Sequence, residues 1–222
     1  MTDLTKNKYG YEKCGEGPKT GDQHRTLGGR LAKPHSQPWV AHFYFQSSYL
    51  CGGAVISRWH VLSAAHCNHG FSYAVLGDHN IQIEDGEEHY KIKKWHDNPK
   101  AHWLQLESGP VINDFAIAEL ILPVIFTDFI KPVCLPTRRT TDYEAKNVTR
   151  SGWGTTKWKG KYPHQLRTTT VTVLSESQCR AAWNKYWGRK FKIDYNSSIL
   201  LCSADARRYE KDSCQGDSGG MR

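Results

Sequence analysis

Three short segments of the chain carry residue types that together support nucleophilic catalysis. His66 follows a run of small residues, and Asp114 directly precedes an apolar run. Ser218 lies among glycines, which let backbone N–H groups approach a ligand closely. A serine hydroxyl is too weakly acidic to attack an amide by itself, so a histidine must accept its proton during the attack. The three residues are therefore candidates for a nucleophile, a general base and the carboxylate that orients the base.

Each of these residues also has an ordinary structural explanation when it is taken alone. His66 would be a core histidine with satisfied hydrogen bonds, Asp114 a turn or capping residue, and Ser218 a loop serine. Taken together, the three segments supply a nucleophile, a base and an orienting acid, which favours the catalytic interpretation.

The composition describes one ordinary folded domain. The 222 residues include 30 Lys and Arg against 22 Asp and Glu, a net charge of +8, and 38% hydrophobic residues, which is enough for a packed core. The most apolar stretch, Phe115 to Phe126, is interrupted by Glu119 and Pro123 and is shorter than the roughly 18 residues of a bilayer span. We therefore expect neither a membrane protein nor a disordered chain. The positive charge is spread over many short segments, which favours solvated loops over a nucleic-acid or heparin surface.

Cysteine usage points to an oxidising compartment. The chain has seven cysteines and no C-x-x-C pair, so disulfides are expected, and the odd count leaves one thiol over. The N-terminus of the chain as given lacks the apolar region of a secretory signal. Two N-x-[ST] sequons, at Asn147 and Asn196, agree with a secreted protein but are weak signals.

The candidate residues must be positioned by short β-strands. Residues 1–25 are polar and basic, and are expected to form a leader that contains Cys14. From Thr26 onward, short runs with β character alternate with turn residues, which indicates an all-β sandwich or barrel. Ser175 to Trp183 carries the one convincing helix signal. The expected strands cover residues 39–45, 53–56, 73–76, 89–95, 115–122 and 168–174.

Four motifs in this order resemble the trypsin and chymotrypsin family of serine endopeptidases. They are Ala-Ala-His66-Cys67, Asn113-Asp114, Ser-Gly-Trp153-Gly and Gly-Asp-Ser218-Gly-Gly. The resemblance covers Thr26 to the last residue and implies a peptidase domain at 26–222. It also implies an all-β fold of two six-stranded antiparallel Greek-key barrels, the second of them incomplete in this chain.

The resemblance assigns a role to each candidate residue. Ser218 would be the nucleophile, His66 the general base and then the general acid, and Asp114 the group that fixes the imidazole tautomer. The backbone N–H groups of Gly216 and Ser218 would form the oxyanion hole.

Two further family features concern specificity and activation. Asp212 falls where trypsin-like members keep a carboxylate at the base of the primary pocket, so Arg or Lys would precede the scissile bond; the alternative is a solvated loop aspartate. Cleavage after Arg25 would free an ammonium at Thr26, which would insert and pair with Asp217. The family usually has Ile or Val where Thr26 stands, and a hydroxyl makes burial less favourable.

The resemblance also sorts the cysteines. It implies the disulfides Cys14–Cys134, Cys51–Cys67 and Cys179–Cys202, and it leaves Cys214 unpaired because the partner in relatives lies beyond Arg222. Relatives continue with strands that complete the second barrel and one wall of the pocket. We therefore expect the 222-residue chain alone to be inactive, as a truncated product or fragment would be.

A loop from Gly77 to Glu88 resembles the calcium-binding loop of the family. Two carboxylates and intervening carbonyls would surround a hard cation that needs six or more oxygens. The alternative is an exposed acidic hairpin without metal, and no cofactor is required for the reaction. The candidate positions are Asp78, Asn80, Ile83, Asp85 and Glu88.

Two functional classes follow from the sequence. The first is a secreted, monomeric serine endopeptidase made as a zymogen, whose partners are protein or peptide substrates with Arg or Lys at the cleavage site, an activating protease and protein inhibitors, with no nucleic acid and no membrane. The second is a non-catalytic homologue that keeps the fold for binding. The presence of all three candidate catalytic residues favours the first.

Overall fold

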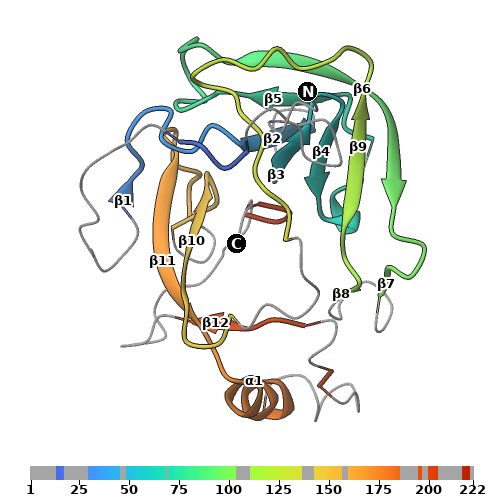
Figure 1. Cartoon of the computed structure of the whole chain (residues 1–222), viewed down its shortest axis with the longest axis vertical. Helices are drawn as coiled ribbons and strands as arrows, with labels where there is room; N and C mark the ends of the chain where they lie inside the picture. The colour runs from blue at the N-terminus through green and yellow to red at the C-terminus, as the bar shows by residue number, and fades with distance from the viewer. Residues whose placement is uncertain are drawn as a thin grey trace, which may run out of the picture.

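A computed structural model of the chain describes residues 14–17, 30–45, 49–68, 70–103, 111–136, 143–156, 160–185, 195–196, 200–204 and 217–220. Within these ranges the chain forms a closed β-barrel and a separate β-sheet, and one α-helix lies beyond the end of that sheet (Figure 1). No helix in the described part of the chain is long and apolar enough to cross a bilayer.

The first half of the chain builds the closed barrel, in the strand order β2-β3-β4-β9-β6-β5. All neighbouring strands are antiparallel, and β2 closes the barrel by pairing with both β3 and β5. The strands are β2 (Val40–Phe45), β3 (Tyr49–Ser57), β4 (His60–Ser63), β5 (Tyr73–Leu76), β6 (Glu88–Asp97) and β9 (Ala116–Leu120).

The barrel core follows from alternation of side chains along these strands. In β9, Ala116, Ala118 and Leu120 are buried while the two residues between them are partly exposed. Phe43 of β2 is fully buried and packs against Trp95 of β6, with ring centroids 5.1 Å apart. The turns that carry His66 and Asp114 lie at one rim of this barrel.

Three strands from the second half of the chain and one from near its beginning form a smaller antiparallel sheet. Its path is β1 (Arg30–Leu31), β11 (Arg167–Val173) and β10 (Asn147–Gly152), and β12 (Ser203–Ala204) pairs with β11. A two-stranded hairpin of β7 (His102–Trp103) and β8 (Val111–Ile112) precedes β9. Helix α1 (Glu176–Trp183) begins at a capping box made by Ser175 and Gln178.

Hydrogen bonds join the barrel to the second sheet at the loop that follows β5. Leu166 donates its N–H to His79 O at 2.8 Å, Ile81 donates to His164 O at 2.9 Å, and the Trp153 indole donates to His79 O at 3.2 Å. Trp153 is 1% exposed. The loop from Gly77 to Glu88 therefore forms part of the contact between the two β units.

The predicted all-β class and barrel architecture are confirmed. The expected helix lies at Glu176–Trp183, and the strand expected at 53–56 lies in the C-terminal half of the longer β3. Strand β4 was not expected, and the strand expected at 115–122 is shorter. The structure contains the disulfides Cys14–Cys134, Cys51–Cys67 and Cys179–Cys202, the three pairs that the resemblance implies.

Candidate active site

Pairing of β4 with β9 brings two of the candidate residues together. Ser63, the last residue of β4, lies opposite Ala116, the first residue of β9. Because the strands are antiparallel, the residues just after β4 and just before β9 emerge at the same rim of the barrel. His66 follows β4 by three positions and Asp114 precedes β9 by two, so a separation of 48 residues in sequence becomes a direct contact.

His66 and Asp114 make two hydrogen bonds. The His66 ring donates from Nδ1 to Asp114 Oδ2 at 2.6 Å, and the His66 backbone N–H donates to Asp114 Oδ1 at 2.9 Å. The side chains are 22% and 23% exposed, respectively. Because the carboxylate can only accept, it holds the hydrogen on Nδ1, and Nε2 is then the basic nitrogen of the neutral ring.

The same contacts set the ionisation of Asp114. Burial would raise the pKa of this carboxyl, but the hydrogen bonds from the side chain and backbone of His66 favour the charged form. Together with the coulombic attraction of His66 and a bond from the Ala65 backbone, they hold the pKa of Asp114 below its ordinary value of 3.8. Asp114 is thus a carboxylate at neutral pH.

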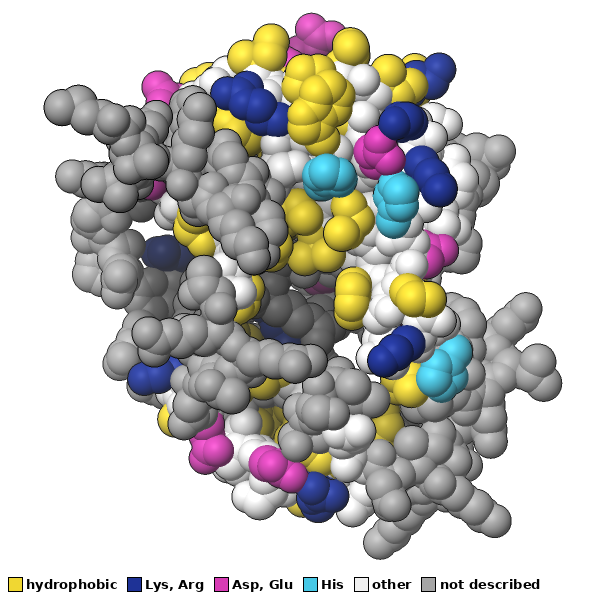
Figure 2. Space-filling view, turned by 45° about the vertical axis from the view of Figure 1, so that its right-hand side comes forward, with side chains coloured by type: hydrophobic (Ala, Val, Ile, Leu, Met, Phe, Trp, Pro, Cys, Tyr) yellow, Lys and Arg dark blue, Asp and Glu magenta, His cyan; other side chains and the backbone are white. Residues whose placement is uncertain are grey.

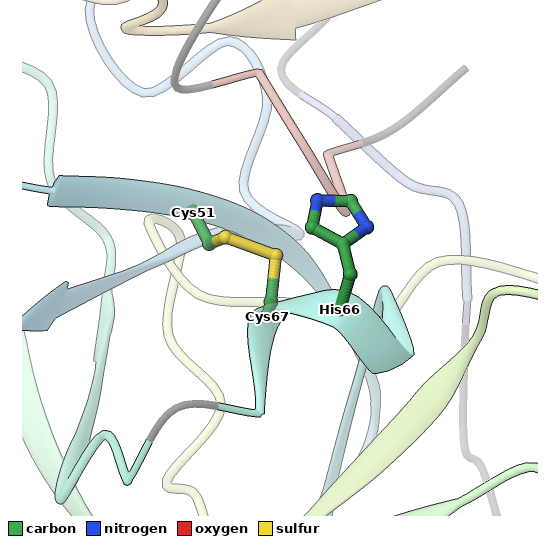
Figure 3. Close-up of side chains that lie close together, drawn as sticks. All are labelled: Cys51, His66 and Cys67. Atoms are coloured by element: carbon green, nitrogen blue, oxygen red, sulfur yellow. A yellow bond between two sulfur atoms is a disulfide. The ribbon is translucent and has the colours of Figure 1, made fainter. Parts of the chain in front are cut away.

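A short 3-10 helix, η1 (Ala65–Cys67), presents His66. The Cys51–Cys67 disulfide ties this turn to β3, and one ring nitrogen of His66 lies within 4.8 Å of both sulfur atoms (Figure 3). The disulfide occupies both sulfurs, so this group is no metal site. It anchors the histidine turn on the barrel wall.

Ser218 lies in a turn of residues 217–220 that is bonded to the same part of the barrel. Gly52 of β3 donates its N–H to Ser218 O at 2.7 Å, and Cys67 Sγ lies 3.7 Å from that oxygen. The segment that carries Ser218 therefore lies against the disulfide that anchors His66.

Gly219 is required by this close approach. Its φ is +74°, and a Cβ at this position would collide with Ser63 Oγ, Gly52 O and Ala64 N. Ser63 in turn donates its hydroxyl to Gly52 O at 2.8 Å in a buried position. Gly52 and Ser63 were missed as site residues in the sequence; the adjacent glycines at 52 and 53 were the available signal.

Asp217 connects the serine turn to the second sheet. Gly154 donates its N–H to Asp217 Oδ1 at 2.9 Å, and a Cβ on Gly152 or Gly154 would overlap the Asp217 carboxylate. Five other predicted site residues lie outside the described residues: Arg25, Thr26, Asp212, Cys214 and Gly216.

The carboxylates of the Gly77–Glu88 loop bind groups of the protein itself. Asp78 Oδ2 pairs with His42 Nε2 at 2.8 Å, where the side chains are 6% and 0% exposed. Asp85 accepts the backbone N–H groups of His79 and Asn80, and Glu88 accepts the Tyr90 hydroxyl. Asp78 Oδ1 is buried without a hydrogen bond among the described residues. A calcium ion at the five positions would have to displace the protein donors that Asp85 and Glu88 hold, so in this structure those two carboxylates serve as hydrogen-bond acceptors within the protein.

Charged groups on the outer face of β6 and β9 offset one another. Glu119 accepts from Lys93 Nζ at 2.5 Å and pairs with His96 Nε2 at 2.8 Å. These hydrogen bonds lower the pKa of Glu119 to about 2. In the described part of the face in Figure 2, basic side chains are interspersed with acidic and hydrophobic ones rather than gathered in one patch.

Both sequons place their asparagine on the surface. Asn147 and Asn196 are exposed, and Asn147 Oδ1 accepts the Thr172 hydroxyl at 3.0 Å. The structure therefore leaves both positions accessible.

Comparison with known proteins agrees with this arrangement. The family described as Trypsin matches residues 26–221. Kallikrein-11 of Mus musculus is 31% identical over 201 residues, which are 90% of this chain and 68% of the relative, and kallikrein-11 of Homo sapiens is 33% identical over 90% and 67%. The proclotting enzyme of Tachypleus tridentatus is 32% identical over 88% of this chain and 54% of its own length. The solved structure of neuropsin, a serine protease expressed in the limbic system of mouse brain, superposes with a TM-score of 0.72 at 30% identity and covers 88% of this chain and 81% of that one.

Proposed function

The chain belongs to the trypsin family of serine proteases, and from this premise we propose that the full-length protein is an endopeptidase that hydrolyses peptide bonds after Arg or Lys. The observation that carries the proposal is the His66–Asp114 contact, 2.6 Å long, beside a turn in which the backbone of Ser218 is bonded to the same barrel wall. A core histidine, a capping aspartate and a loop serine with separate structural roles would not need to be held at the same part of the barrel.

In the proposed reaction, Ser218 Oγ attacks the carbonyl carbon of the scissile bond and passes its proton to His66 Nε2. Asp114 keeps the imidazole oriented and stabilises the imidazolium. The backbone N–H groups of Gly216 and Ser218 would hold the oxyanion, at about 3–4 kcal/mol for each donor. His66 then gives the proton to the leaving amine. Water takes the place of the amine and attacks the acyl-enzyme while His66 accepts its proton, and His66 returns a proton to Ser218 Oγ as the serine leaves.

The preference for Arg or Lys rests on Asp212 in the proposed pocket. An anion there, shielded from water, favours a substrate side chain that brings a cation.

Asp78, Asp85 and Glu88 take no part in the proposed reaction, and no cofactor is required for it.

Activation is proposed to follow cleavage after Arg25. The new ammonium at Thr26 would pair with Asp217, and the packing of Asp217 against Gly154 supports a role for this carboxylate in shaping the serine turn. Residues 1–25 would be a leader that stays attached through Cys14–Cys134. The protease would be a secreted monomer that meets protein substrates, an activating protease and protein inhibitors, without nucleic acid or membrane.

The test uses the complete gene product that contains these 222 residues, with its disulfides formed. The protein is cleaved after Arg25 by immobilised trypsin, the beads are removed, and turnover of an arginyl amide is compared with that of a phenylalanyl amide. We expect turnover of the arginyl substrate that is lost in Ser218→Ala. Preference for the phenylalanyl substrate would overturn the assigned specificity, and equal rates for wild type and Ser218→Ala would overturn the function in favour of a binding homologue.

A further inference from the structure

The residue before Asp114 has an unusual backbone conformation. Asn113 has φ = +51°, in the left-handed region, and Phe115 donates its N–H to Asn113 O at 2.9 Å. Asn is one of the few residues with a side chain that adopts this conformation readily. Asp114 therefore sits in a tight turn between β8 and β9.

A second asparagine, Asn98, bonds to both residues that flank Asp114. Asn98 follows β6 directly; its backbone N–H donates to Phe115 O at 3.0 Å and its side-chain Nδ2 donates to Asn113 O at 3.1 Å. Its Oδ1 also accepts the Lys100 N–H at 3.1 Å, so the amide is oriented from both ends. Asn98 therefore holds the backbone on either side of Asp114.

Asn113 returns a bond to the same segment. Its Nδ2 donates to Lys100 O at 3.1 Å. Two side-chain amides thus join the turn after β6 to the turn before β9. Asn98 donates from the first turn to the second, and Asn113 donates from the second to the first. The bond from Asn98 Nδ2 to Asn113 O is partly buried, whereas that from Asn113 Nδ2 to Lys100 O is exposed, so water competes less for the first of the two.

The end of β6 is also bonded to the histidine turn. Asn68, the residue that follows η1, donates from Nδ2 to the carboxylate of Asp97, the last residue of β6, at 2.9 Å. The end of β6 therefore braces both turns, the one with His66 and the one with Asp114. The direct His66–Asp114 contact closes this ring of interactions.

We propose that Asn98 and Asn113 are positioning residues that hold the Asp114 carboxylate in register with His66. This inference rests on the proposed function, in which that contact fixes the tautomer of the general base. A displacement of about 1 Å in such a group can cost on the order of 100-fold in rate. The bonds of Asn98 and Asn113 oppose such a displacement because they fix the backbone on both sides of Asp114.

The experiment measures Asn98→Ala and Asn113→Gly in the complete, activated protein. Glycine keeps the left-handed conformation at 113 and removes only the side-chain amide. We expect kcat on an arginyl amide to fall 10-fold or more in each variant, with KM within two-fold of wild type. Asn184→Ala, at an exposed asparagine after α1, is the matched control and should leave both constants unchanged.

A second measurement does not depend on turnover. A proton in a short hydrogen bond such as that between His66 Nδ1 and Asp114 gives a strongly downfield proton NMR signal, which is assigned by its absence in His66→Ala. We expect this signal to move upfield or broaden beyond detection in Asn98→Ala and Asn113→Gly, and to persist in Asn184→Ala.

The outcomes separate the two claims. If folded variants keep the wild-type signal and kcat, the positioning role is wrong. If the wild type shows the signal without serine-dependent turnover, the proposed function fails, while the effect of the variants on the signal still decides the positioning role. Should Asn98→Ala not fold, the near-isosteric Asn98→Asp, which keeps the acceptor for Lys100 and loses the donor to Asn113, replaces it with the same expectation.

Discussion

Gly52 donates its backbone N–H to the carbonyl oxygen of Ser218, 166 positions later in the chain, at a distance of 2.7 Å. A Cβ on Gly52 would collide with the backbone of Gly220, at 2.7 Å from its Cα and 2.9 Å from its nitrogen. The serine turn is thus fitted directly against the wall of the barrel that carries His66. The position of the proposed nucleophile depends on two backbones that approach without side chains between them.

Gly219→Ala is expected to lower kcat/KM at least 100-fold. The new Cβ would meet Ser63 Oγ and Gly52 O, so the serine turn must move away from the barrel. The matched control is Gly70→Ala, because Gly70 also has positive φ, +82°, but nothing within 4 Å of the added Cβ. We expect that variant to cost only about 1–2 kcal/mol of stability and to keep full activity. Equal activity losses in the two variants would show that backbone strain, and not the collision, is responsible.

Replacing Cys51 and Cys67 together by alanine is expected to destabilise the protein by about 3 kcal/mol, because their disulfide closes a loop with a sequence separation of 16. The change should also lower activity, since it frees the turn that carries His66. Denaturant unfolding and turnover of the arginyl amide measure the two effects. Unchanged activity in the folded variant would mean that the disulfide does not position His66.

The contribution of Glu119 to stability is expected to disappear in acid. Its pKa is lowered from an ordinary 4.5 to about 2, first by the hydrogen bond from Lys93 and then by that from His96. A depressed folded pKa means that the stabilisation is present above about pH 4.5 and is lost as the pH falls toward 2. The difference in unfolding free energy between wild type and Glu119→Gln should therefore shrink between these values. A difference that stays constant from pH 7 to pH 2 would contradict the pairing.

The melting temperature is expected to be the same in millimolar calcium and in EDTA, because the loop carboxylates already hold protein groups. His42→Ala should destabilise the protein by about 3–5 kcal/mol, since it leaves the buried Asp78 carboxylate without its hydrogen-bond partner. Calorimetry of both proteins in both buffers is the measurement. A rise in the wild-type melting temperature with calcium would restore the predicted metal site.

The sequence predicted the parts of the site that depend on local motifs. His66, Asp114 and Ser218 were found because their neighbours follow a recognisable pattern, and the β4–β9 register then explains how the first two meet. The His42–Asp78 pair was not predicted, because His42 is 36 residues away and nothing in its surroundings marks it as an acid's partner. Asn98 was missed for the same reason. Asn98 meets Asn113 because the end of β6 lies beside the start of β9. The sequence alone does not show where those strands end or that their ends are adjacent.

The central claim is that Ser218, His66 and Asp114 act as one nucleophilic unit. The most direct measurement is mass spectrometry of the complete, activated protein after treatment with a fluorophosphonate, which reacts with serines made nucleophilic by a neighbouring base. We predict one adduct on Ser218, formed rapidly in the wild type and lost in His66→Ala. No adduct on Ser218 in the wild type, or an adduct that forms as fast in His66→Ala, would contradict it.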